Sequence, residues 1–242
     1  MAEFDRPSVA ARPGTAAVVD QGLRSYMLKV YNYMGLGLVV TGLVAYFAYN
    51  WATASQANFD LLYASPLSWV IMLAPLAFVL VLSFGIRKLS VPIAQVLFWA
   101  FAAVMGLSLS SIFAVYTGAS IAQVFFISAA TFGAMSLYGY TTKRDLTQIG
   151  SFLIMGLIGV VIASVVNIFL HSSGLSFAIS IVGVLVFVGL TAWDTQKIKE
   201  SYDVGLGAEV LAKGAIMGAL SLYLDFINLF LMLLRLFGNQ RN

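Results

Sequence analysis

Two carboxylates lie inside apolar stretches of the sequence, where a charge is costly. Of the ten acidic residues, Asp194 directly follows the apolar run Ile181–Trp193, and Asp225 lies within the run Leu220–Leu234. On insertion scales a charge at membrane depth costs at least about 2.5 kcal/mol, so such residues commonly mark ion or proton pathways. The alternatives are an interfacial helix end for Asp194, close to Lys197, and a buried structural hydrogen-bonding group for Asp225.

Asp225 has polar neighbours on one helix face. Ser221 lies four positions before it and Asn228 three positions after it, so three oxygen-bearing side chains share that face. A polar stripe within an apolar span must face protein or water rather than lipid. The spacing therefore predicts that Asp225 points into the protein, with Ser221 and Asn228 as its supporting polar face.

Asp194 and Asp225 are expected to be neighbours, because they lie on consecutive antiparallel helices at similar depth. Two carboxyl groups in contact away from water cannot both ionise at low cost, so such a pair shares a proton and switches as the pH changes. The pair also offers hard oxygen ligands to a divalent metal ion. Calcium takes about six to eight oxygens, so two carboxylates would bind it only weakly. The residues alone do not distinguish a proton switch from a calcium site.

The composition of the chain requires a membrane. Of 242 residues, 61% are hydrophobic and 10% are charged, and the mean hydropathy is +0.94. Soluble domains are about one quarter charged, so lipid is the solvent that this surface requires. The net charge of +3 comes from short loops rather than from a basic stripe, which argues against nucleic acid as a partner.

Motifs for catalysis are missing from the sequence. It contains no cysteine, no nucleotide-binding loop, no zinc-ligand spacing and no serine elbow with a base nearby. The single histidine, His171, is expected in a solvated loop. We therefore expect neither an enzyme nor a resident cofactor.

We expect an all-α polytopic membrane protein with seven spanning helices, because about 20 mostly apolar residues cross a bilayer. The seven windows are Val30–Tyr49, Leu67–Gly85, Pro92–Tyr116, Ala119–Tyr140, Ile149–Leu170, Leu175–Ile198 and Gly214–Phe237. They divide the chain into a polar cytoplasmic N-terminal arm (1–29), a transmembrane domain (30–237) and a short tail (238–242).

Small residues recur at helical spacing in several of these windows. Gly106 and Ser110 form one pair, and Gly35, Gly37 and Gly42 form a group. In lipid, small residues let helix backbones approach closely. We therefore expect these positions at helix–helix contacts.

The connections between the spans alternate in charge. All thirteen Lys and Arg residues except Arg235 and Arg241 fall on one side, whereas the loops 50–66, 117–118 and 171–174 on the other side contain none. The positive-inside rule then places the N-terminus in the cytoplasm. Seven spans put Arg235 and Arg241 outside, whereas a re-entrant last helix would return the tail to the inside.

Four separated segments resemble the Bax inhibitor-1 (transmembrane BAX inhibitor motif) family, in its bacterial form. They are Met105–Ile112 (MGLSLSSI), Phe132–Asp145 (FGAMSLYGYTTKRD), Phe187–Ile198 (FVGLTAWDTQKI) and Ala219–Phe230 (ALSLYLDFINLF). The similarity covers residues 20–237 and is specific, because several motifs agree in order.

The resemblance implies a seven-helix bundle in a bacterial inner membrane, with the last helix at the centre. It also implies a pH-sensitive calcium leak gated by two aspartates, which map onto Asp194 and Asp225. A family arginine that bonds to the first aspartate in the closed state maps onto Arg87. The leading hypothesis is therefore a calcium-permeable leak channel that responds to protons.

Two other hypotheses stay open. A non-conducting regulator of a membrane protease or stress response would act through protein–protein contacts. That role predicts a co-purifying membrane protein and tolerance of the substitution Asp225→Asn. A proton-coupled transporter would need a substrate pocket, and the sequence shows no further intramembrane charge to form one.

Overall fold

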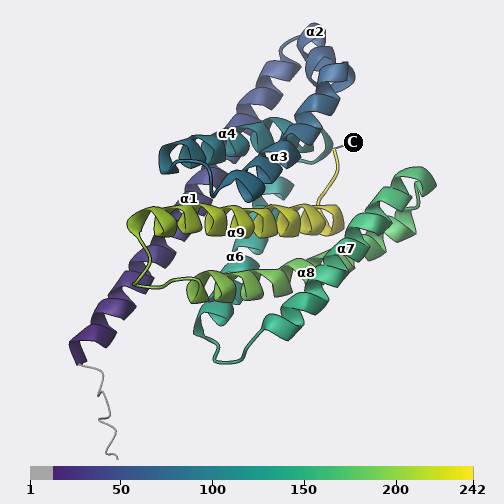
Figure 1. Ribbon diagram of the computed structural model, residues 1–242. Coiled ribbons are helices and arrows are strands. Elements are labelled where there is room, and N and C mark those ends of the chain that lie inside the picture. Colours follow the sequence, from purple (N-terminus) through teal and green to yellow (C-terminus); the bar gives the residue numbers. More distant parts are fainter. Residues whose placement is uncertain (1–12, 242) are drawn as a thin grey trace, which may run out of the picture.

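The protein is an all-α bundle of long apolar helices (Figure 1). The computed structural model describes residues 13–241. The seven helices long enough to cross a membrane are α1 (Pro13–Thr53), α3 (Pro66–Gly85), α4 (Val91–Leu109, continued to Val115), α6 (Gly118–Thr141), α7 (Thr147–Leu170), α8 (Ser173–Glu200) and α9 (Ala208–Phe237). The predicted all-α class and the seven predicted spans are confirmed.

Two boundaries differ from the prediction. The arm predicted for residues 1–29 is helical from Pro13 onward, and proline is favoured at a first helical position. Residues 1–12 of that arm lie outside the described part. The third span is interrupted at Ser110, whose hydroxyl donates to the Leu107 carbonyl (2.7 Å), before the short helix α5 (Ile112–Val115) completes it.

The loop between the first two spans contains two short helical pieces, α2 (Gln56–Phe59) and the π-helical turn η1 (Asp60–Ala64). The Ser55 side chain caps α2 by accepting from the Asn58 backbone N–H (3.2 Å). This loop lies at the end of the bundle that carries the α2 label in Figure 1, which we call the opposite end. The loops that contain Lys and Arg lie at the other end, which we call the basic end.

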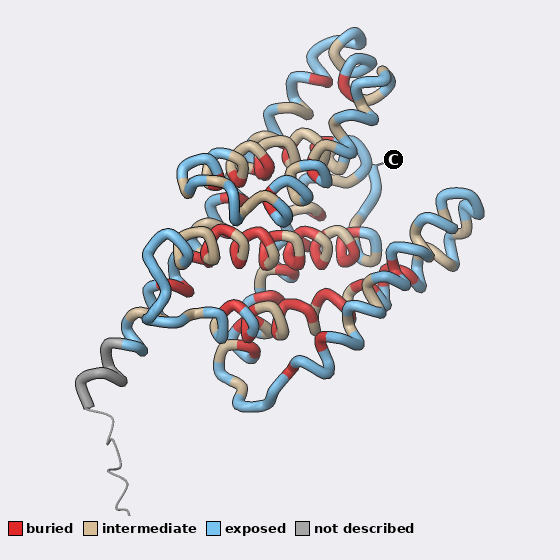
Figure 2. The backbone as a smooth tube through the Cα atoms, in the orientation of Figure 1, coloured by how far each residue is buried: buried red, intermediate tan, exposed pale blue. Residues whose placement is uncertain are grey.

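Helix α9 lies at the centre of the bundle, as the resemblance predicts. It packs against α1, α4, α6 and α8, and most of its residues from Ala215 to Leu234 are buried (Figure 2). A helix that is apolar around most of its circumference belongs inside protein rather than at a surface. A buried polar group in this part of α9 is therefore removed from lipid and from bulk water.

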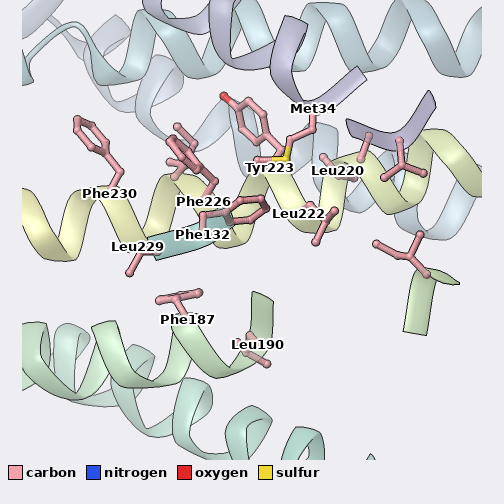
Figure 3. Packing of buried hydrophobic residues seen from close by; sticks show 14 of the residues in the cluster. Met34, Phe132, Phe187, Leu190, Leu220, Leu222, Tyr223, Phe226, Leu229 and Phe230 are labelled. Atoms are coloured by element: carbon pink, nitrogen blue, oxygen red, sulfur yellow. The ribbon is translucent and has the colours of Figure 1, made fainter. Parts of the chain in front are cut away.

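The core forms around both sides of α9 (Figure 3). Toward α4 the Tyr223 ring packs edge-on against Phe101, with ring centroids 5.1 Å apart. Toward α6 the Phe226 ring packs edge-on against Phe125 at 5.4 Å. Toward α8, Phe187 fills the space between the two helices. Aromatic packing thus fixes the rotation of α9 about its own axis.

Glycines set the register between α8 and α9. Gly218 packs against Ile198 near the basic end, and Gly183 packs against Met232 near the opposite end. The two helices therefore keep one antiparallel register along their length. In that register Asp194 lies about one helical turn closer to the basic end than Asp225.

Helix α7 belongs to a hairpin with α8 that diverges from the bundle toward its tip (Figure 1). At the basic end the hairpin is tight, because Gly150 of α7 makes room for the Trp193 indole of α8. The tip turns at His171, which is exposed and ends α7 in the left-handed conformation (φ 50°), a position that usually holds glycine. The divergence leaves a gap between α7 and α9.

The C-terminal tail lies at the opposite end of the bundle. The Thr117 N–H donates to the Asn239 carbonyl (3.1 Å), and the Arg241 N–H donates to the Val115 carbonyl (2.9 Å). Helix α9 has 30 residues, about 45 Å, and therefore crosses the whole bundle. The alternative of a re-entrant last helix is wrong.

Candidate functional site

A cavity of about 610 Å³ lies in the gap between α7, α8 and α9. Each helix contributes one face, at spacings of three and four residues. The residues are Ile154, Leu157, Val160, Val161, Ser164, Val165 and Ile168 of α7; Phe187, Leu190, Trp193, Asp194 and Lys197 of α8; and Ser221, Leu224, Asp225, Asn228, Met232 and Arg235 of α9. The cavity extends along α9 for about four turns.

Asp194 and Asp225 meet in this cavity. Their carboxyl groups lie within direct interaction range of each other, as the antiparallel arrangement predicts. Asp194 is half-buried, whereas Asp225 is only 5% exposed. One oxygen of Asp225, Oδ2, is buried and has no hydrogen-bond partner among the described residues. Buried polar atoms are almost always paired, so this exception is expected to have a function.

The predicted polar face also lies in the cavity. Ser221 and Asn228 line it together with Asp225. The Asn228 side-chain amide donates to the Leu224 carbonyl of its own helix (2.8 Å), so its Oδ1 is the atom left for another partner. The site therefore offers four oxygen-bearing side chains, two of them carboxylates.

The described residues contain no cluster of three or more His, Cys, Asp or Glu side chains. Two carboxylates, one hydroxyl and one amide oxygen are fewer ligands than calcium requires, so water would complete its coordination. Such a site suits an ion that passes through better than one that is held permanently.

Two cations flank the carboxylates. Lys197 lines the basic end of the cavity, and its ammonium lies 4.8 Å from the centre of the Trp193 ring. Arg235 lines the cavity near the opposite end. The sequence indicated Lys197 only as a marker of the helix end, and it placed Arg235 only on the side away from the basic loops. Their spacing from Asp194 and Asp225, i+3 and i+10, was the signal that could have found them.

Arg87 is not part of this cavity. It is exposed, directly after α3, and does not line the space around the two aspartates. Within residues 13–241, Lys213–Glu209 is the one ion pair, so Arg87 forms none there. Its role as a latch stays a prediction.

The polarity of the cavity changes along its length. Asp194 and Asp225 lie toward the basic end. Beyond Asn228, apolar side chains of α7 and α9 dominate as far as Arg235. The cavity therefore has a polar half around the carboxylates and a mainly apolar half beyond them.

A second buried polar cluster lies on the other side of α9. The Tyr223 hydroxyl and Thr41 Oγ1 are 2.6 Å apart, and Thr41 also lies 2.8 Å from the Ala102 carbonyl. These contacts join α9, α1 and α4. Sequence reasoning missed this cluster, because Thr41 and Tyr223 are 182 residues apart and each resembles an ordinary core position.

The buried carboxylate of the central helix lies opposite a second carboxylate. These features place the chain in a class of polytopic membrane proteins with an intramembrane acidic pair. The chain belongs to the Bax inhibitor-1 family: residues 23–242 match the family described as inhibitor of apoptosis-promoting Bax1. The resemblance drawn from the four motifs is confirmed.

Its relatives are bacterial. An uncharacterized protein of Rickettsia prowazekii, RP147, is 53% identical over 92% of this chain and 93% of its own length. The inner membrane protein YbhL of Escherichia coli K12 is 53% identical over 91% of this chain and 94% of its own length. An uncharacterized protein of Caulobacter vibrioides is 45% identical over the full length of both chains.

Proposed function

We propose that this protein is a calcium-permeable leak channel whose gate is the Asp194–Asp225 pair and whose flux responds to pH. The observation that carries the proposal is the buried Asp225 carboxyl group, which has an unpaired oxygen and faces Asp194 in a cavity of about 610 Å³. The family resemblance implies the same activity for the same two residues.

The pair supplies the response to protons. When the two carboxyl groups share a proton, they carry one negative charge and hold each other close. When that proton leaves, two like charges repel within a poorly hydrated site, and a divalent cation or water is needed to stabilise them. Loss of the shared proton and its return therefore both act directly on the distance between α8 and α9.

Calcium flux into proteoliposomes is the direct test. Purified protein is reconstituted with a calcium-sensitive dye, and the flux is measured from pH 5 to pH 8. We expect the flux to depend on pH for the unmodified chain and to lose that dependence in Asp194→Asn and Asp225→Asn. The matched control is Asp203→Asn, which changes an exposed carboxylate in the α8–α9 connection and should leave the profile unchanged.

A calcium flux that changes neither with pH nor in Asp225→Asn contradicts the proposed channel. That result, together with a membrane protein that co-purifies with the chain, would favour the non-conducting regulator. The proposal includes no catalytic step and no resident cofactor. Calcium is treated as the permeating ion.

We also propose that the basic end faces the cytoplasm of a bacterial inner membrane. The charge of the loops and the name of the relative YbhL support this orientation and location. Because the chain has no cysteine, single cysteines can report sidedness. A membrane-impermeant maleimide added to intact spheroplasts should label Ser172→Cys and spare Lys143→Cys, and the reverse pattern would overturn the orientation.

A further inference from the structure

A second hollow lies on the other side of the bundle, between α1 and α6. In the described chain these two helices do not pack closely on each other, because α1 packs on α4 and α9 while α6 packs on α8 and α9. Two cavities of about 600 and 510 Å³ occupy the gap, and Phe132 lines both. They extend along α1 from Arg24 to Leu43, about 28 Å. We call the two cavities together the α1–α6 groove.

Glycines keep the groove open. A side chain built at Gly133, Gly35 or Gly42 would meet nothing within 4 Å, and all three line or border the groove. By contrast, Gly37 packs against Phe98 and Tyr223. The prediction of close helix packing is therefore wrong for Gly35 and Gly42.

The groove offers an apolar interior. The polar atoms of its walls bond to each other: the Tyr31 hydroxyl lies 2.6 Å from Ser136 Oγ, which lies 3.0 Å from Thr195 Oγ1. The other lining residues of the larger cavity are mainly apolar, including Met27, Leu28, Phe132 and Leu137. Because the groove opens within a membrane-spanning region, lipid rather than water is available to fill it.

Two cations stand at the mouth of the groove on the basic end. Arg24 lines the larger cavity directly, is exposed, and forms no ion pair within the described chain. Lys199 lies beside the lining residue Tyr140: its ammonium donates to the Tyr140 carbonyl (2.8 Å) and lies 5.5 Å from the centre of the ring. An apolar slot that ends at two cations complements an acyl chain that ends at a phosphate.

We propose that the α1–α6 groove binds an anionic phospholipid from the leaflet at the basic end. The phosphate lies between Arg24 and Lys199, and one acyl chain extends along the groove to Phe132. A partner helix fits less well. An apolar helix would give Arg24 and Lys199 no anionic group to contact.

Native mass spectrometry of the purified full chain tests this proposal. Detergent-solubilised protein is mixed with equal amounts of phosphatidylglycerol and phosphatidylcholine that carry the same acyl chains. We expect the unmodified chain to retain phosphatidylglycerol in preference, by about fivefold for each cation that contacts the headgroup, because phosphatidylcholine has no net charge. Gly133→Leu, which fills the groove, should lower retention of both lipids about tenfold.

Arg24→Gln should lower the preference for phosphatidylglycerol over phosphatidylcholine about fivefold, because Lys199 remains. The matched controls are Gly159→Leu on α7, another exposed glycine with open space around it, and Lys88→Gln in another basic loop. Thermal melting of every variant checks its fold, and Arg24→Gln changes an exposed residue that the fold does not require.

Equal retention of both lipids by the unmodified chain would overturn the proposal. So would identical behaviour of Gly133→Leu and Gly159→Leu. A polypeptide that the unmodified chain retains and Gly133→Leu loses would assign the groove to a partner helix instead.

Discussion

Tyr223 and Asp225 are two residues apart on α9 but lie in different surroundings. Tyr223 points toward α1 and α4, where Thr41 accepts or donates its hydrogen bond and aromatic rings enclose it. Asp225 points toward α8 and a cavity, and one of its oxygens has no partner in the described chain. Both side chains are buried, so burial alone does not separate structure from function.

What separates them is whether the buried polar group is satisfied. A satisfied buried group stabilises one arrangement, whereas an unsatisfied one costs free energy and is retained only if it does something else. We call the two sides the tight side, around Tyr223, and the hollow side, around Asp225. The tight side should hold α9 in place while the hollow side changes.

The largest effect is expected from a side chain added on the tight side. A Cβ at Gly106 would lie 2.6 Å from the Thr41 carbonyl oxygen and 2.8 Å from Val44, so α1 and α4 must move apart. Gly106→Ala should therefore lower the free energy of unfolding by about 3 kcal/mol, measured by unfolding in mixed detergent and SDS. Gly159→Ala on α7, where nothing lies within 4 Å, is the control. It should be neutral or slightly stabilising. Equal losses would mean that the close contacts around Gly106 do not cause the loss of stability.

The next comparison concerns the two polar groups themselves. Asp225→Leu removes an unsatisfied buried carboxyl group, so it should raise the free energy of unfolding by about 1 kcal/mol while abolishing pH-dependent flux. Tyr223→Phe removes a satisfied hydroxyl, so it should lower stability by about 1 kcal/mol and preserve the flux. Unfolding and flux are measured on the same two proteins. If Asp225→Leu destabilises the fold more than Tyr223→Phe does, Asp225 is a structural residue.

Part of the hollow side could be predicted from the sequence. The 3.6-residue period alone places Ser221, Asp225 and Asn228 on one face, and hydropathy alone finds the spans, because both are local properties of a helix in lipid. The antiparallel order of α8 and α9 also predicted Asp194 as the partner, at similar depth. Its offset from Asp225 along the helices depends on which glycines contact which side chains, and the seven-residue connection does not determine that offset.

The tight side could not be predicted. The contact between Thr41 and Tyr223 joins the first span to the last, and nothing local distinguishes these residues from other core positions. The same limit applies to Gly35 and Gly37, which have the same type and nearly the same place in sequence. One faces the open groove and the other packs against Phe98, because helix rotation relative to the neighbours decides the difference.

A smaller effect tests which cation acts on the hollow side. Lys197 lines the cavity with the two aspartates, and Arg87 does not. A nearby ammonium favours ionised carboxyl groups, so Lys197→Gln should move the midpoint of the pH–flux profile upward by about half a unit. Arg87→Gln should leave the midpoint unchanged if the cavity residues alone set it. A shift in Arg87→Gln and none in Lys197→Gln would support the latch that the family resemblance assigns to Arg87.

The smallest effect is expected from deleting the tail, whose hydrogen bonds hold the end of α9 on the tight side. Asn239 and Arg241 bond to the turn before α6, and the Arg241 guanidinium also contacts Tyr49 of α1. These bonds are at the surface and few, so deleting the residues after Gly238 should lower the free energy of unfolding by about 1 kcal/mol or less. The pH midpoint of calcium flux should not change, because the hollow side is untouched. If the midpoint moves, α9 shifts as a unit when its end is released, and the tight side does not hold the helix independently of the gate.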